Sequence, residues 1–292
     1  MILTKSATAN VGSMIIQKII DPEDGSEKIE RYAVLENLGA DGDAQSYICQ
    51  KLSSGAQYFM KAYNTSTMKL RRKSRLHSEI TIQKSLEHPN ILKLDHSFKT
   101  KQMIYLLFEL CERSSFSDLL KKRGPLREPK VREYSSQLLS ALKFLKKNLI
   151  IHRDLKLGNL FLADNDQVKI TGFGSSARLV EKTERRFTIC GSSNLLAPEI
   201  LDGGESGHSF EVDIWNFGII LYSLTFGNPP FGSSTVKEVY RRVKEGRIEF
   251  PSEIETSEEI KALISSILVR EPENRISLLS SIHFLINNYI RE

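Results

Sequence analysis

Cysteine is scarce in this sequence. The 292 residues include three cysteines, Cys49, Cys111 and Cys190, which are far apart and lack the spacing of metal ligands. This excludes a disulfide-held secreted domain and a structural zinc site. The expected location is a reducing compartment, the cytoplasm or the nucleus.

The chain also lacks a long apolar run. Residues 14–20 are mostly apolar, but Gln17 and Lys18 interrupt them, and no run approaches the ~18 residues that a membrane-spanning helix needs. The net charge is +5, and the basic residues form short clusters, such as 71–73 and 121–123, without interleaved aromatic residues. Neither membrane insertion nor nucleic-acid binding is therefore expected.

What is present is typical of a globular protein, with 40% hydrophobic and 26% charged residues. The length suits one large domain or two lobes. Residues 1–28 form a polar, turn-rich extension with one candidate short strand at 14–20. Between residues 32 and 109, alternating apolar residues predict five strands, and a helical period around Glu79 predicts one helix. The remainder is mainly helical, so the sequence predicts an α+β fold.

The stretch with the clearest chemistry is 150–159, which reads Ile-Ile-His-Arg-Asp-Leu-Lys-Leu-Gly-Asn. Its spacing suits phosphoryl transfer: Asp154 would accept a hydroxyl proton, Lys156 would meet the moving phosphate, and Asn159 would bind a metal. Alone, Asp154 would be interpreted as a turn carboxylate. The full run is much less frequent by chance.

This run resembles the catalytic loop of the protein-kinase family, and Lys-Leu-Gly-Asn resembles its Polo-like branch. The stretch 208–215, His-Ser-Phe-Glu-Val-Asp-Ile-Trp, carries the same likeness. The resemblance covers about residues 30–290 and implies a bilobal fold, with a small five-stranded N-lobe and a larger, mainly helical C-lobe. The implied boundaries are an extension at 1–28 and a kinase domain at 29–292, divided into an N-lobe at 29–109, a hinge at 109–112 and a C-lobe at 113–292.

The resemblance also assigns roles to single residues. The family's ATP and Mg²⁺ would involve the positions Lys61, Glu79, Gly39, Gly42, Glu109, Cys111 and Phe161, with Phe108 as gatekeeper. Lys61 and Glu79 would form an ion pair. Thr188 would receive an activating phosphate and Arg153 would bind it, although an exposed loop threonine is an equal alternative. Glu199, Asp213 and Arg275 match structural positions of the C-lobe.

Three departures concern the nucleotide site. The family's Asp-Phe-Gly, whose Asp binds magnesium, reads Gly172-Phe173-Gly174. The glycine-rich loop carries Asp41 and Asp43, and a carboxylate ~4 Å from a phosphate charge costs about 4 kcal/mol at an effective dielectric of 20. Phe59 replaces the family's small residue above adenine, on the same strand face as Lys61. ATP and Mg²⁺ are therefore expected to bind weakly or not at all.

The sequence supports two alternative functions. The first is a pseudokinase that acts by protein–protein interaction, with an active kinase or a cytoskeletal assembly as partner. The second is an active serine/threonine kinase in which Asn159 holds a lone metal, favoured by the intact Asp154, Lys156 and Asn159. The resemblance leaves no sequence for a Polo-box region, so either the chain is part of a longer protein or the protein lacks that module.

Overall fold

The computed structural model describes residues 9–20, 25–111, 114–163, 165–202, 207–278 and 280. The chain divides into two compact units, one made of Met1–Leu86 and Leu92–Glu112, and the other of Glu87–Ile91 and Arg113–Glu292. Within the described ranges, no helix is long and apolar enough to cross a membrane.

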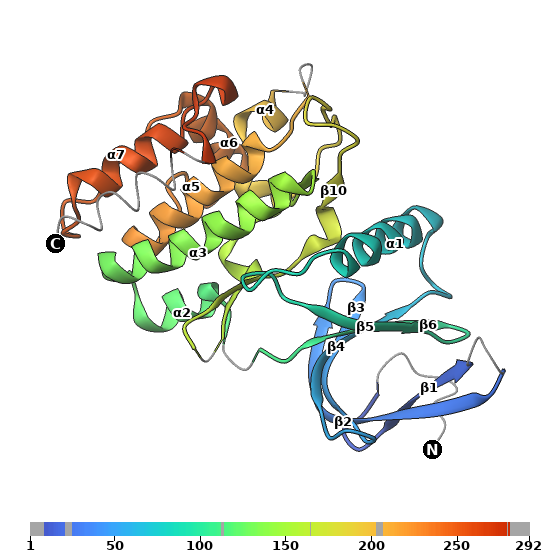
Figure 1. Ribbon diagram of the computed structural model, residues 1–292. Helices are drawn as coiled ribbons and strands as arrows, with labels where there is room; N and C mark the ends of the chain where they lie inside the picture. The colour runs from blue at the N-terminus through green and yellow to red at the C-terminus, as the bar shows by residue number, and fades with distance from the viewer. Residues whose placement is uncertain are drawn as a thin grey trace. The chain divides into compact units, whose positions relative to one another are not determined.

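The first unit is a curled antiparallel sheet with one helix (Figure 1). Its strands follow the order β1-β2-β3-β4-β6-β5. The elements are β1 (Met14–Ile20), β2 (Glu27–Asp41), β3 (Ala44–Lys51), β4 (Gln57–Asn64), α1 (Leu70–Lys84), β5 (Leu94–Lys99) and β6 (Met103–Glu109). The α+β class is confirmed. The five strands predicted up to residue 109 are confirmed as β2 to β6, and the candidate strand at 14–20 is confirmed as β1, which pairs with β2 and brings the sheet to six strands.

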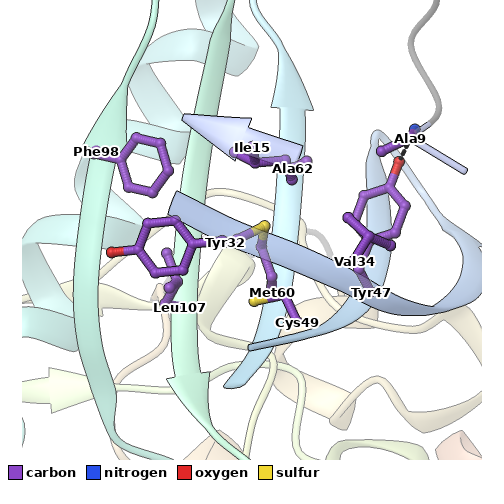
Figure 2. Close-up of a cluster of buried hydrophobic side chains, with 10 residues drawn as sticks. All are labelled: Ala9, Ile15, Tyr32, Val34, Tyr47, Cys49, Met60, Ala62, Phe98 and Leu107. Atoms are coloured by element: carbon purple, nitrogen blue, oxygen red, sulfur yellow. Dashed lines mark hydrogen bonds between the residues drawn. The ribbon is translucent and has the colours of Figure 1, made fainter. Parts of the chain in front are cut away.

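One face of this sheet encloses an apolar core that the N-terminal segment helps to cover (Figure 2). Tyr32 stacks on Phe98 with ring centroids 5.5 Å apart, and Ile15 of β1 is buried in the same cluster. The backbone N–H of Ala9 donates to the Tyr47 hydroxyl at 2.7 Å. Residues assigned to a separate extension are thus part of the core of the first unit.

The second unit is mainly helical. Its helices are α2 (Phe116–Arg123), α3 (Glu128–Lys147), α4 (Pro198–Leu201), α5 (Glu211–Phe226), α6 (Val236–Glu245) and α7 (Glu258–Ile267), and its short strands are β7 (Ile150–Ile151), β8 (Leu160–Leu162), β9 (Val168–Ile170) and β10 (Ala177–Arg178). The predicted helices at 116–122 and 128–147 are confirmed.

Helix α5 is the central element of this unit. It is apolar all round and is buried from Val212 to Phe226, as expected for a helix enclosed by others. It contacts both α3 and α7, between which it runs in Figure 1. Gly227 ends it in the left-handed conformation, with φ 82°, which glycine adopts without steric cost.

Candidate active site

The loop 152–159 follows the buried strand β7, which pairs with β10. Its backbone is held by Asp213 of α5, whose carboxylate accepts the N–H groups of His152 and Arg153 at 2.8 Å each. These two bonds fix Arg153 at a positive φ of 66°, which costs energy for a non-glycine residue. Burial raises the pKa of Asp213 to about 6. Asp213 therefore positions the loop, and it does not face a substrate.

The Asp154 carboxylate lies at the centre of a polar network. The Ser192 hydroxyl and backbone N–H donate to its Oδ1 at 2.8 and 2.9 Å. Lys156 Nζ lies 3.2 Å from its Oδ2 and donates to the Ser192 hydroxyl at 2.7 Å. Residues from two distant segments thus orient Asp154 and Lys156. The Ser192 hydroxyl is thus a further member of this network.

Asn159 faces both Asp154 and Gly172. Its Nδ2 donates to the Asp154 backbone carbonyl at 2.8 Å and to the carboxylate at 3.3 Å. Gly172 is in the left-handed conformation with φ 82°, and a Cβ placed there would lie 2.6 Å from Asn159 Cγ. The Asn159 amide thus occupies the space in which a side chain at position 172 would begin.

This arrangement lacks one of the two side chains that would hold the family's magnesium ion. Gly172 offers no carboxylate, which leaves only the Asn159 amide oxygen, because the Asn159 amide nitrogen donates to Asp154. Magnesium takes oxygen ligands in near-octahedral geometry. Among the described residues, no group of three or more acidic, histidine or cysteine side chains is arranged to hold a metal. No metal-dependent step is therefore assigned to this site.

The contact between Gly172 and Asn159 makes a prediction about stability. We expect Gly172→Ala to lower the free energy of unfolding by more than the ~1–2 kcal/mol of a left-handed non-glycine residue, because its Cβ also overlaps Asn159. Adding Asn159→Ala should remove the overlap and with it the steric part of this loss. The double variant should therefore lose less free energy of unfolding than the sum of the two single variants, by about 1 kcal/mol or more. Urea unfolding of all four proteins measures this.

Gly246 provides the matched control. It is also left-handed, with φ 66°, but a Cβ there would meet nothing within 4 Å. Gly246→Ala should therefore cost only the conformational part, ~1–2 kcal/mol. Strict additivity of Gly172→Ala and Asn159→Ala would contradict the described contact.

In the first unit, Phe59 and Lys61 share one face of β4. Lys61 Nζ lies 5.9 Å from the centroid of the Phe59 ring, and Phe59 packs on Phe108 with centroids 6.0 Å apart. Cys111 belongs to the same apolar cluster, whereas Met60 faces the opposite core. The alternation predicted for this strand is confirmed: Phe59 lies on the face that carries the Lys61 and Phe108 positions.

Arg72 is a residue of this site that no sequence pattern indicated. Its Nε donates to the Asp43 carboxylate at 2.7 Å, and its guanidinium reaches Glu79 at 4.0 Å. The Asp43 carboxylate is thus already paired with a cation, so the expected unfavourable charge at this position is smaller than predicted. The Asp41 side chain lies outside the described residues. The Lys61–Glu79 ion pair stays a prediction.

The other expected nucleotide contacts lie in both units. Gly39 and Gly42 have positive φ of 91° and 60° at the β2–β3 turn, and the Glu109 carboxylate accepts the Lys93 N–H at 2.9 Å in the first unit. Phe161 lies on β8 in the second unit and is half-buried. Their roles toward a nucleotide stay predictions.

Thr188, the threonine predicted to be regulatory, is exposed in the structure. Thr188 lies between the exposed side chains Phe187 and Ile189, and Arg153 Nε donates to the Ser175 carbonyl at 2.7 Å. Near this segment the structure adds a residue without an assigned role, His208, which is 1% exposed and exchanges backbone hydrogen bonds with Arg186. No sequence signal marked His208 as close to these arginines.

His208 predicts a pH dependence of stability. Burial, followed by the charges of Arg153, Arg185 and Arg186, lowers its pKa to about 4. An unfolded histidine binds its proton near pH 6.5, so stability is fully present above that pH and is lost as the pH falls toward 4. We expect His208→Phe to reduce this loss by about 2 to 3 kcal/mol.

Chemical denaturation at pH 7 and pH 4.5 measures the difference. His152, whose pKa burial also lowers to about 4, is present in both proteins and cancels in the comparison. An equal loss of unfolding free energy between pH 7 and pH 4.5 in the wild type and in His208→Phe would contradict the prediction.

The pair Glu199–Arg275 is present as the resemblance implies. Arg275 donates to both carboxylate oxygens of Glu199 at 2.7 Å, and the two side chains, Arg275 and Glu199, are 1% and 7% exposed. The guanidinium carbon also lies 5.0 Å from the centroid of the Trp215 ring. This contact connects α4 to the segment that follows α7.

Comparison with known proteins agrees with these contacts. The protein kinase domain family matches residues 32–286. The chain is 45% identical over 254 residues to a probable serine/threonine-protein kinase PLK of Dictyostelium discoideum, covering 87% of this chain and 26% of that protein. It is 42% identical over 242 residues to the cell cycle serine/threonine-protein kinase CDC5/MSD2 of Saccharomyces cerevisiae, covering 82% and 34%.

A third relative is the serine/threonine-protein kinase PLK2 of Mus musculus, 38% identical over 268 residues, covering 91% of this chain and 38% of that protein. The chain therefore spans between 26% and 38% of the length of these three relatives.

Proposed function

Since the chain belongs to the protein kinase domain family, as a Polo-like serine/threonine kinase domain, we propose that it is a pseudokinase that binds ATP and Mg²⁺ weakly or not at all. One observation carries this proposal: Gly172 replaces the metal-binding Asp, and the Asn159 amide fills the space beside it. Phe59 adds to it, because its ring lies on the strand face where the family keeps a small residue above adenine.

The protein would then act by binding other proteins. A folded domain that keeps its second-unit core and its Glu199–Arg275 pair, but not its magnesium ligand, retains surfaces for partners. We place its partners among active kinases or cytoskeletal assemblies and its location in the cytoplasm or nucleus. The three cysteines, all of them free thiols, suit such a compartment.

A second candidate is an active kinase, and a specific observation favours it. Asp154, Lys156 and Ser192 form a connected network, which a chain without catalytic use would not need. The relatives are also described by name as serine/threonine-protein kinases.

Radiolabelled ATP and casein as acceptor distinguish the two. We expect no incorporation above that of Asp154→Asn. Incorporation that disappears in Asp154→Asn would reject the pseudokinase and establish the second candidate. Equal incorporation by both proteins would identify a contaminating kinase, which further purification should remove.

A further inference from the structure

A groove of about 620 Å³ lies in the second unit, between α4, α6 and the segment that precedes α4. We call it the α4–α6 groove. Its floor is apolar: Leu196 and Ile200 are buried at 8% and 4% exposure, and Leu201 is half-buried beside them. Ile189 stands at the margin with 68% of its surface exposed. Ile189 therefore continues the apolar floor to the edge of the groove.

The α6 side of the groove is cationic. Thr235 and one carboxylate, Glu238, line it together with Lys237, Tyr240, Arg241 and Lys244. The spacing of these last four residues, i, i+3, i+4 and i+7, places them on one face of the helix. The three cations are exposed. Cations at i and i+4, such as Lys237 and Arg241, repel each other on a helix surface, so the sequence of α6 carries a local cost on this face.

Carboxylates of the second unit neutralise this face incompletely. Arg241 and Arg242 both pair with Glu238, and Arg241 also pairs with Glu245. Lys244 shares Asp202 with Arg270. These four cations, two of which line the groove, thus share only the three carboxylates of Glu238, Glu245 and Asp202. Within the described ranges no ion pair involves Lys237. The groove combines an apolar floor with an excess of positive charge at its edge.

These features select one class of occupant. A volume of this size accepts a few side chains, and a groove beside a helix suits an amphipathic helix that inserts residues spaced i, i+3, i+4 and i+7. Nucleic acid would use the cations but would leave the apolar floor uncovered. A second copy of this chain is disfavoured, because its net charge of +5 would be repelled by the same cations.

We propose that the α4–α6 groove is the docking site for an acidic amphipathic helical segment of a partner protein. Its apolar side chains would contact Ile189 and Leu201, and its carboxylates would pair with Lys237, Arg241 and Lys244. The proposal names the chemistry of a partner for the interaction role above. It holds whether or not phosphoryl transfer is lost, because none of these residues belongs to the Asp154–Asn159–Gly172 site.

A designed peptide tests the proposal with the full chain. The probe is a fluorescein-labelled peptide of about 18 residues, with leucines at i, i+3, i+4 and i+7 and glutamates elsewhere, and binding is followed by anisotropy at 0.15 M salt. A peptide of the same composition with scrambled leucine positions controls for charge alone. A DNA oligonucleotide of equal length tests the other anionic class.

Two variants carry the result. Lys237→Glu with Arg241→Glu and Lys244→Glu should weaken binding of the peptide about tenfold or more, since three exposed attractions become repulsions. Ile189→Asp, at an exposed position, should weaken it similarly through the apolar contact. The matched control reverses Lys121, Lys122 and Arg123 to glutamate at the end of α2 in the same unit, and it should change the affinity by less than about twofold.

Thermal unfolding of each variant identifies those that are folded, and only these are compared. Three results would each overturn the proposal. The first is that the α2 control loses as much affinity for the peptide as the α6 variant, and the second is that the scrambled peptide binds as tightly as the designed one. The third is that the oligonucleotide binds more tightly than the designed peptide and that the α6 reversal abolishes its binding. Binding is measured without nucleotide. A positive phosphotransfer assay would therefore reject the pseudokinase and leave this inference standing.

Discussion

Millimolar Mg-ATP is expected to leave the melting temperature of the wild-type chain unchanged. A ligand that binds only the folded state at 100 times its Kd would stabilise it by about 2.7 kcal/mol, which amounts to several degrees for a domain of this size. Phe59 lies on the strand face of Lys61 and contacts Phe108, and Asn159 fills the space beside Gly172. Both the adenine position and the metal position are therefore altered.

Restoring single residues should not restore binding. Gly172→Asp alone is expected to produce no shift, since Phe59 still lies on the strand face of Lys61 and Asp41 still adds a negative charge to the glycine-rich loop. Phe59→Ala, Asp41→Gly and Gly172→Asp together should produce a magnesium-dependent shift of several degrees. Differential scanning calorimetry with Mg-ATP, and with EDTA and ATP as control, measures this.

The order of effects is informative. A shift in Gly172→Asp alone would mean that Phe59 does not obstruct adenine. A shift in the wild type would contradict the steric argument as a whole and would favour the active-kinase candidate.

Arg275→Ala is expected to destabilise the fold strongly. Arg275 donates to both Glu199 oxygens and also to the backbone carbonyls of Val269, Arg270 and Glu211. Removing it leaves the Glu199 carboxylate, 7% exposed, without its cation. Breaking a buried pair in this way costs about 3–5 kcal/mol, which lowers the melting temperature by on the order of 10 °C.

A neighbouring arginine supplies the control. Arg270 pairs with Asp202 at 3.3 Å, and both side chains are exposed, at 49% and 39%. Arg270→Ala should cost at most about 1 kcal/mol, because solvent screens such a pair. Similar melting temperatures for the two variants would show that burial of the Glu199–Arg275 pair does not contribute to stability as described.

The sequence by itself determined the fold class and the identity of the site. Strand alternation placed Phe59 and Lys61 on one face, and the apolar period predicted the helices at 116–122 and 128–147. The fixed spacing of Asp154, Lys156 and Asn159 indicated the kinase loop, because those residues act within one short segment. Such local patterns are visible without a fold.

Only the tertiary structure decided the contacts between distant segments. Arg72 pairs with Asp43, 29 residues apart in the sequence, and β1 becomes a sixth strand because it pairs with the edge of β2. Asn159 meets position 172 only because Gly172 adopts a left-handed backbone, and the α4–α6 groove requires the floor and the cationic face to come together. These features depend on side-chain direction and backbone conformation after folding, which neither residue order nor hydrophobic period encodes locally.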